Sequence, residues 1–164
     1  MANVLLVVPP GIRPRAARDH ALDAAARAGG ALVGLVLLDP AETARIAATL
    51  DSAFMGERVS DRVVEILARE QRSQGEAVLG EIAAHAAARG VPFVPLIEAG
   101  DADEVCARVI RTQHIAEAVL VVEKRSWLSR ILSRSAAVKL PAMANCALTV
   151  MEEAAGGGGE RGDG

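Results

Sequence analysis

Basic side chains and serines gather directly after the fourth of five short apolar runs in this sequence. The stretch from Glu123 to Lys139 carries five cations against one carboxylate, on a chain whose net charge is −3. The cations are Lys124, Arg125, Arg130, Arg134 and Lys139. Arg130 and Arg134 are four residues apart and would share one face of a helix. With Ser126 and Ser135 they predict a site for a phosphate or other anion, because a guanidinium can bind such groups with two parallel hydrogen bonds.

The same stretch lacks the feature that most phosphate sites share. Phosphates are commonly held by backbone N–H groups at a glycine-rich turn, where the missing Cβ permits close approach. No glycine occurs between Glu123 and Ser135, and the carboxylate of Glu123 would repel a phosphate group. Two interpretations of this stretch stay open. It is either an anion site built from side chains or a solvated helix face that pairs with the acidic tail or a second subunit.

The remaining reactive residue types form no catalytic or metal-binding pattern. Cys106 lies on an apolar helical face, and Cys146 would be reactive only if a local positive field lowered its pKa. Asp101 and Asp103 follow a glycine, where carboxylates serve as helix caps. Three histidines are expected on three different helices without ligand spacing. They are His20, His85 and His114. We therefore expect no enzyme, no catalytic residue and no bound metal.

Five apolar runs predict the strands that must position these residues. Continuous apolar runs are typical of strands buried on both faces of a sheet. The predicted strands are Val4–Val8, Ala31–Leu38, Val91–Glu98, Ala118–Val122 and Ala147–Met151. Pro92 and Pro95 favour a sheet edge for the third strand, since proline cannot donate to a ladder.

Helical patterns separate these strands along the chain. They predict Arg15–Ala28, a short helix Glu42–Leu50, a long helix capped by Ser60 that runs toward Arg89, a helix after Gly100, and a helix ended by Pro141. The middle of the long helix is polar at 70–74, so part of it should overhang the sheet. Strands separated by helices imply right-handed crossovers. The sequence predicts a doubly wound α/β fold: one five-stranded, mostly parallel sheet with helices on both faces.

Length and composition restrict the class of protein. A chain of 164 residues with 51% hydrophobic residues predicts one domain, 1–153, followed by a disordered glycine-rich tail, 154–164. Aromatic residues make up 2% and the net charge is negative, so nucleic acid is not an expected partner. No apolar run approaches the ~20 residues of a membrane helix. The start, 1–4, has no basic segment of a secretory signal, and the two cysteines form no disulfide framework. We expect a cytoplasmic protein without membrane insertion.

In the order of its segments the chain resembles the universal stress proteins, from Asn3 to Glu152. The opening strand is followed at once by a helix, as in that family. The segment 100–105, with the strand 116–122, is similar to the family's glycine–acid helix start and its next strand. The segments 128–135 and 145–150 are similar to its last helix and its closing strand. The resemblance implies a Rossmann-like fold of the adenine-nucleotide α-hydrolase type.

The chain departs from the nucleotide-binding members of that family at the residues that hold the nucleotide. Those members carry an acid at the end of the first strand and a loop of pattern G-x-x-G, nine residues, then G and Ser/Thr. Pro9 stands near the expected acid, and Glu123 and Ser126 stand at the first two glycine positions. After a shortened spacer Arg134 replaces the third glycine, and only Ser135 matches. The resemblance therefore implies a branch that does not bind ATP, with no cofactor. Trp127 would fill the space of the missing nucleotide, cover a ligand or anchor a partner.

Three functions follow, of which the first is favoured. The first is a non-catalytic cytoplasmic stress-response protein that acts as a homodimer and contacts an unidentified protein partner, without ATP. Its dimer element would be the last strand, because an apolar sheet edge invites pairing with its own copy. That element comprises Ala147, Leu148, Thr149, Val150 and Met151. The second is a module that senses a nucleotide or phosphorylated metabolite through the basic loop 124–135, and the third is a weak ATP-binding universal stress protein.

Overall fold

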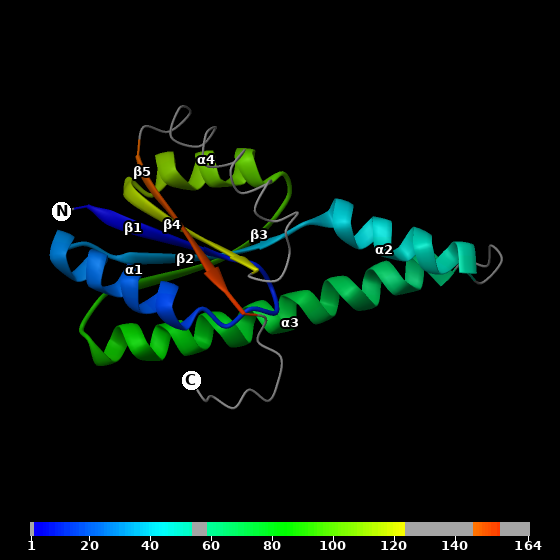
Figure 1. The fold of residues 1–164 in the computed structure, drawn as a ribbon, viewed down its shortest axis with the longest axis horizontal. Helices are drawn as coiled ribbons and strands as arrows, with labels where there is room; N and C mark the ends of the chain where they lie inside the picture. The colour runs from blue at the N-terminus through cyan, green and yellow to red at the C-terminus, as the bar shows by residue number, and fades with distance from the viewer. Residues whose placement is uncertain (1, 54–58, 124–145, 155–164) are drawn as a thin grey trace.

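A computed structural model describes residues 2–53, 59–123 and 146–154 (Figure 1). The strands in this part of the chain are β1 (Asn3–Val8), β2 (Leu32–Leu38), β3 (Phe93–Ala99), β4 (Ile115–Glu123) and β5 (Ala147–Glu153). The helices are α1 (Arg15–Ala28), α2 (Pro40–Ala53), α3 (Val59–Ala88) and α4 (Ala102–Thr112). All five predicted strands are confirmed. The predicted helix that ends at Pro141 and the predicted disorder of the tail from residue 155 onward lie outside the described residues.

The strands form one sheet in the order β3-β2-β1-β4-β5, and every neighbouring pair is parallel. The chain moves from β1 outward to β3, then crosses to β4 and ends at β5. This is the predicted doubly wound arrangement. β3 forms one edge, as its prolines indicate, and β5 forms the other.

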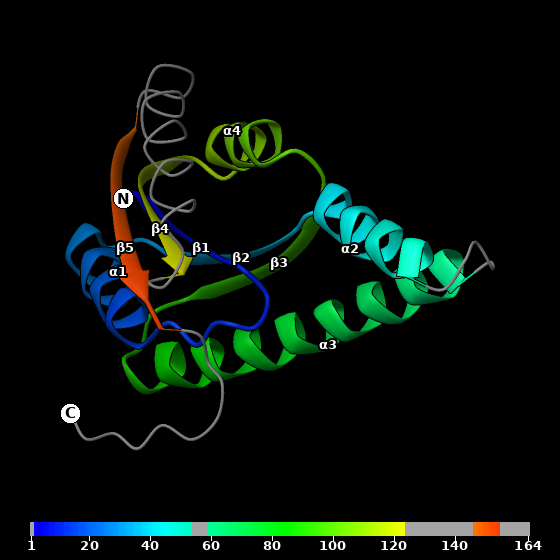
Figure 2. The same ribbon diagram turned by 45° about the vertical axis from the view of Figure 1, so that its right-hand side comes forward.

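Helices cover both faces of the sheet, with α1 and α3 on one face and α4 on the other (Figure 2). Alternate residues of β1 point to the two faces. Leu6 and Val8 are buried with α1 and α3, whereas Leu5 and Val7 are buried with α4. The core thus consists of two apolar layers with β1 between them, which is why this strand is apolar without interruption.

The boundaries of three helices differ from the sequence prediction. α2 is longer than predicted on both sides, since it extends from Pro40 to Ala53. α3 begins at Val59, one residue before the predicted cap Ser60. His114, expected on a helix, lies two residues beyond the end of α4 and has a positive φ of 56°. A left-handed residue at this place ends the helix and turns the chain into β4.

α2 and the first half of α3 extend beyond the sheet as a helical arm (Figures 1 and 2). The two helices pack against each other there. Side chains of α3 between 65 and 73 are mostly exposed, among them Glu70 and Ile66, which is 56% exposed. The predicted overhang of the long helix is therefore confirmed, and only its second half, with buried Val78 and Ile82, packs on the sheet.

The lack of a side chain at Gly34 on β2 determines how β3 packs. A Cβ at this position would lie 2.8 Å from Cε1 of the Phe93 ring and 3.1 Å from Cδ2 of Leu79. The ring of Phe93 therefore rests directly on the backbone of β2, below α3. Gly80 on α3 differs, because a Cβ there would meet no atom within 4 Å.

These two glycines give a matched pair of substitutions. We expect Gly34→Ala to destabilise the protein by roughly 1–2 kcal/mol, because the ring of Phe93 must move away. Gly80→Ala should stabilise it by up to ~1 kcal/mol, since alanine favours the helix and meets no neighbour. Urea denaturation followed by circular dichroism measures both. Equal stability of the two variants would contradict the packing described here.

Candidate functional site at the carboxyl edge of the sheet

Ligands of open α/β sheets usually bind outside the carboxyl ends of the strands. In a parallel sheet all these ends lie along one edge. Here the edge is formed by the residues that end or follow each strand. They are Pro9, Asp39, Gly100, Glu123 and Glu153.

The chain leaves β1 without an acidic residue. Pro9 follows the strand directly, and its carbonyl oxygen accepts a hydrogen bond from Ile12 N–H at 3.4 Å. Gly11 has φ +90°, which closes this tight turn. The position predicted for an acid in nucleotide-binding relatives is thus part of an apolar turn, and no carboxylate is presented there.

The ends of β4 and β5 carry three carboxylates, of which Glu123 and Glu153 lie on the α1 face of the sheet and Glu152 lies on the α4 face. Val122 pairs in register with Glu152, and Glu123 pairs with Glu153. Like charges this close together raise the cost of bringing a phosphate to this part of the edge. The sequence prediction expected repulsion of phosphate from Glu123 only. Glu152 and Glu153, which the predicted last strand did not include, add to this repulsion.

One of these carboxylates caps the first helix. Oε2 of Glu153 accepts a hydrogen bond from the backbone N–H of Ala17 at 2.7 Å. Ala17 is the third residue of α1, and its N–H has no partner within the helix. Pro14, at the cap position, makes no side-chain hydrogen bond, and the first turn carries no acid. The chain thus supplies from β5 the negative charge that the start of this helix favours.

Sequence reasoning missed this contact, since it ended the last strand at Met151. The two residues are 136 positions apart. The only local indication was a helix start at a proline without a serine, threonine or aspartate to cap it.

The carboxylates after β3 serve the structural role that the sequence predicts. Oδ1 of Asp101 accepts a hydrogen bond from Glu104 N–H at 3.1 Å and caps α4. The described part of the chain contains no cluster of three or more His, Cys, Asp or Glu that could hold a metal ion.

Both cysteines lie in environments that disfavour the thiolate. Burial, reinforced by the carboxylate of Asp103, raises the pKa of Cys106 to about 11. Burial also raises the pKa of Cys146. Cys106 is a core residue, as predicted. Neither thiol is poised as a nucleophile.

The histidines are not brought together. Within the described ranges, His20 on α1 is the histidine that approaches a charged partner, with its Nε2 at 3.5 Å from Oε2 of Glu117. The two side chains form an ion pair when the imidazole ring is protonated. The pair lies on the α1 side of β4, away from the carboxyl edge of the sheet.

The predicted site residues fall into two groups. The ligand-binding candidates Ser126, Arg130, Arg134 and Ser135, with Trp127, lie outside the described residues. The predicted dimer element lies on β5, at the edge of the sheet. On this strand Ala147 and Val150 are exposed, while Leu148, Thr149 and Met151 are half-buried. Among the described helices none has both the length and the apolarity needed to cross a lipid bilayer.

The fold is that of universal stress proteins. A protein of the universal stress protein family from Burkholderia pseudomallei superposes with a TM-score of 0.62 and 21% identity, over 91% of this chain and 94% of that one. Universal stress protein UspA from Lactobacillus plantarum superposes with a TM-score of 0.61 and 20% identity, over 91% of this chain and 96% of that one. A universal stress protein in complex with cAMP superposes with a TM-score of 0.56 and 14% identity, over 93% of this chain and 98% of that one. No protein-family model and no curated protein matches the sequence.

The cap that Glu153 provides can be tested by substitution. We expect Glu153→Ala to lower the free energy of unfolding by about 1 kcal/mol, the usual cost of losing a helix cap. Glu153→Gln retains an acceptor oxygen and should lose less. The matched control is truncation after Glu153, which removes the tail and should change stability by less than ~0.5 kcal/mol. Thermal denaturation measures all three. A larger loss from the truncation than from Glu153→Ala would contradict this assignment.

Proposed function

We propose that this chain is a universal stress protein that performs no catalysis and binds no ATP, and that it acts in the cytoplasm as a homodimer in contact with a protein partner. The observation that carries this proposal is the hydrogen bond between Glu153 and Ala17 N–H. The start of α1 lies at the carboxyl edge, and a helix start there is a natural anion site. In this chain a carboxylate of its own already occupies it.

The charges around this contact support the absence of ATP binding. Glu123 lies in register with Glu153 at the ends of β4 and β5, and Glu152 lies on the other face of the same strand end. A triphosphate placed over this edge on the α1 face would meet the carboxylates of Glu123 and Glu153. Pro9 offers no acid for a ribose or a metal ion at the end of β1. Binding energy for ATP would have to come from the basic loop 124–135 alone, without the backbone amides that glycines present.

The exposure and charge of β5 support self-association. Val150 is 36% exposed in the middle of this edge strand. In an antiparallel pair centred on Val150, Ala147 of one copy would lie opposite Glu153 of the other. The acidic ends of the two copies would then be separated by the length of the strand. Pairing through the edge would also satisfy backbone groups that an edge strand leaves open.

A second candidate is a sensor of a nucleotide or another phosphorylated metabolite. It is supported by the similarity to a universal stress protein in complex with cAMP. Such a ligand carries one or two charges and meets less repulsion than ATP. Ser126, Arg130, Arg134 and Ser135 would then hold its phosphate. A weak ATP-binding protein is the third possibility, and the acidic edge argues most directly against it.

A nucleotide titration separates these functions. We expect millimolar Mg-ATP to leave the fluorescence of Trp127, the only tryptophan, unchanged and to remain unhydrolysed. Saturation at ~100 times the dissociation constant would instead add about 2.7 kcal/mol of stability. AMP and cAMP are titrated in parallel. A saturable response to them that Arg130→Ala and Arg134→Ala abolish would establish the sensor, and a response to ATP would refute the proposal.

The dimer is tested with two matched substitutions of exposed apolar residues. Val150→Lys places a charge on the β5 edge and should convert the dimer to a monomer at micromolar concentration, because charged side chains block edge pairing. Ile66→Lys, on the helical arm, is the control and should leave the dimer intact. Light scattering coupled to size-exclusion chromatography gives the mass. A monomeric wild-type protein would refute this part of the proposal.

A further inference from the structure

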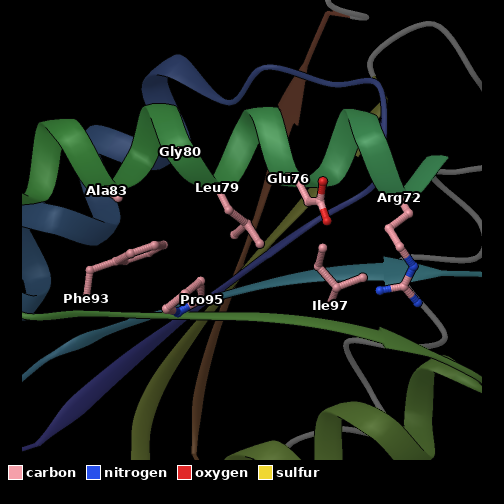
Figure 3. Close-up of a pocket in the computed structure, with 8 residues that line it drawn as sticks. All are labelled: Arg72, Glu76, Leu79, Gly80, Ala83, Phe93, Pro95 and Ile97. Carbon is pink, nitrogen blue, oxygen red and sulfur yellow. The ribbon is translucent and has the colours of Figure 1, made fainter. Parts of the chain in front are cut away.

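A groove of about 500 Å³ runs between α3 and the edge strand β3, at the opposite edge of the sheet from β5 (Figure 3). Its lining is apolar along most of its length. The apolar residues are Leu79 and Ala83 from α3, and Phe93, Pro95 and Ile97 from β3. This volume lies in the range of small-molecule sites, which are mostly apolar with few polar groups. Nothing in the proposed function uses this groove.

The floor and wall of the groove depend on two glycines. Gly34 leaves room for the ring of Phe93 against β2, where the ring forms part of the groove lining. Gly80 is on the α3 side, where a Cβ would meet no atom within 4 Å. A side chain at either position would reduce the space.

The free edge of β3 is unsuited to adding a further strand. Leu32 N–H donates to Pro92 O, and Gly100 N–H donates to Leu38 O. With the parallel register between β2 and β3, these bonds mean that even-numbered residues of β3 face β2 and odd-numbered ones face outward. Pro95 is an outward residue and has no N–H to offer. A peptide strand would lose a hydrogen bond at the centre of the edge, so the groove favours a small molecule.

One end of the groove is charged. Arg72 extends from α3 past Ile97, and Glu76 lies one turn further along α3, nearer the apolar end (Figure 3). Arg72 makes no hydrogen bond or ion pair within the described part of the chain. Its guanidinium is therefore available to an anion at this end. From Arg72 to Ala83 the helix rises ~16 Å, at 1.5 Å per residue.

We propose that this groove binds a free fatty acid of medium chain length. The carboxylate binds Arg72, and the hydrocarbon chain lies over Leu79, Pro95 and Phe93. A guanidinium binds a carboxylate with two parallel hydrogen bonds, which sets the direction of the ligand. Glu76 adds a repulsion that grows with the charge of the head group, so a singly charged carboxylate is favoured over a doubly charged phosphate.

The test is titration calorimetry of the full chain with decanoate below its micelle concentration. We expect one saturable site per chain. Decanol, which lacks the charge, and decyl phosphate, which has a second one, should each bind at least roughly tenfold more weakly. Arg72→Gln should weaken decanoate roughly tenfold while leaving decanol unchanged. Arg62→Gln, an exposed arginine of the same helix outside the groove, is the charge control and should leave decanoate binding unchanged.

Filling the groove tests the location independently of charge. Gly80→Leu should abolish decanoate binding, whereas Gly80→Ala keeps most of the space and should bind. Ala87→Leu, on the exposed side of α3, controls for an added leucine, and circular dichroism verifies that each variant folds. Absence of saturable binding by the wild-type protein would overturn the proposal. So would decanoate binding that survives Gly80→Leu, or a change in oligomeric state caused by Gly80→Leu, which would show that the groove holds a second copy.

Discussion

The burial of β1 on both faces is the constraint on which this structure depends. Leu5, Leu6 and Val8 are fully buried, and β1 has β2 on one side and β4 on the other. A parallel strand in this place needs a helix layer above and below it, since neither face can remain in water. The crossovers must therefore go to both sides, α1 and α3 to one and α4 to the other. The same arrangement brings the carboxyl ends of all strands to one edge and makes β3 and β5 the outer strands.

The two outer strands end the sheet in different ways. β3 carries Pro95 at an outward position, which protects this edge from a further strand, and the groove below α3 is left open to solvent. β5 has no proline and carries acids at its end, Glu152 and Glu153. Among the described residues, proline thus blocks backbone pairing at the β3 edge and does not block it at the β5 edge. This asymmetry is the physical basis of the two proposals, a small ligand at the first edge and a second copy of the chain at the second.

Local patterns predicted the elements of this fold well where burial is the cause. Val4–Val8 is apolar because both faces are covered, and of the two prolines that predicted an edge, Pro95 lies on the outward side of β3, where proline cannot donate. The end of β5 was missed, since Glu152 and Glu153 are acidic and only their ladder with Val122 and Glu123 extends the strand. The cap of α1 by Glu153 was missed because it joins residues far apart in sequence.

The left-handed conformation of His114 could not be predicted, because it depends on where α4 ends and the residue type does not indicate it. The basic candidate site lies outside the described residues, and the groove at α3 depends on absent side chains at Gly34 and Gly80.

α3 joins two regions of unequal packing in one continuous helix. Its second half is held by the sheet, whereas its first half packs on α2 among the described elements and exposes Ile66 to solvent. Regions with few buried apolar contacts open locally at a lower free energy than the core. Amide hydrogen exchange should therefore be faster in the arm half of this single helix than in the half around Ile82. This difference would divide α3 into two cooperative units, and Arg72 lies where they meet.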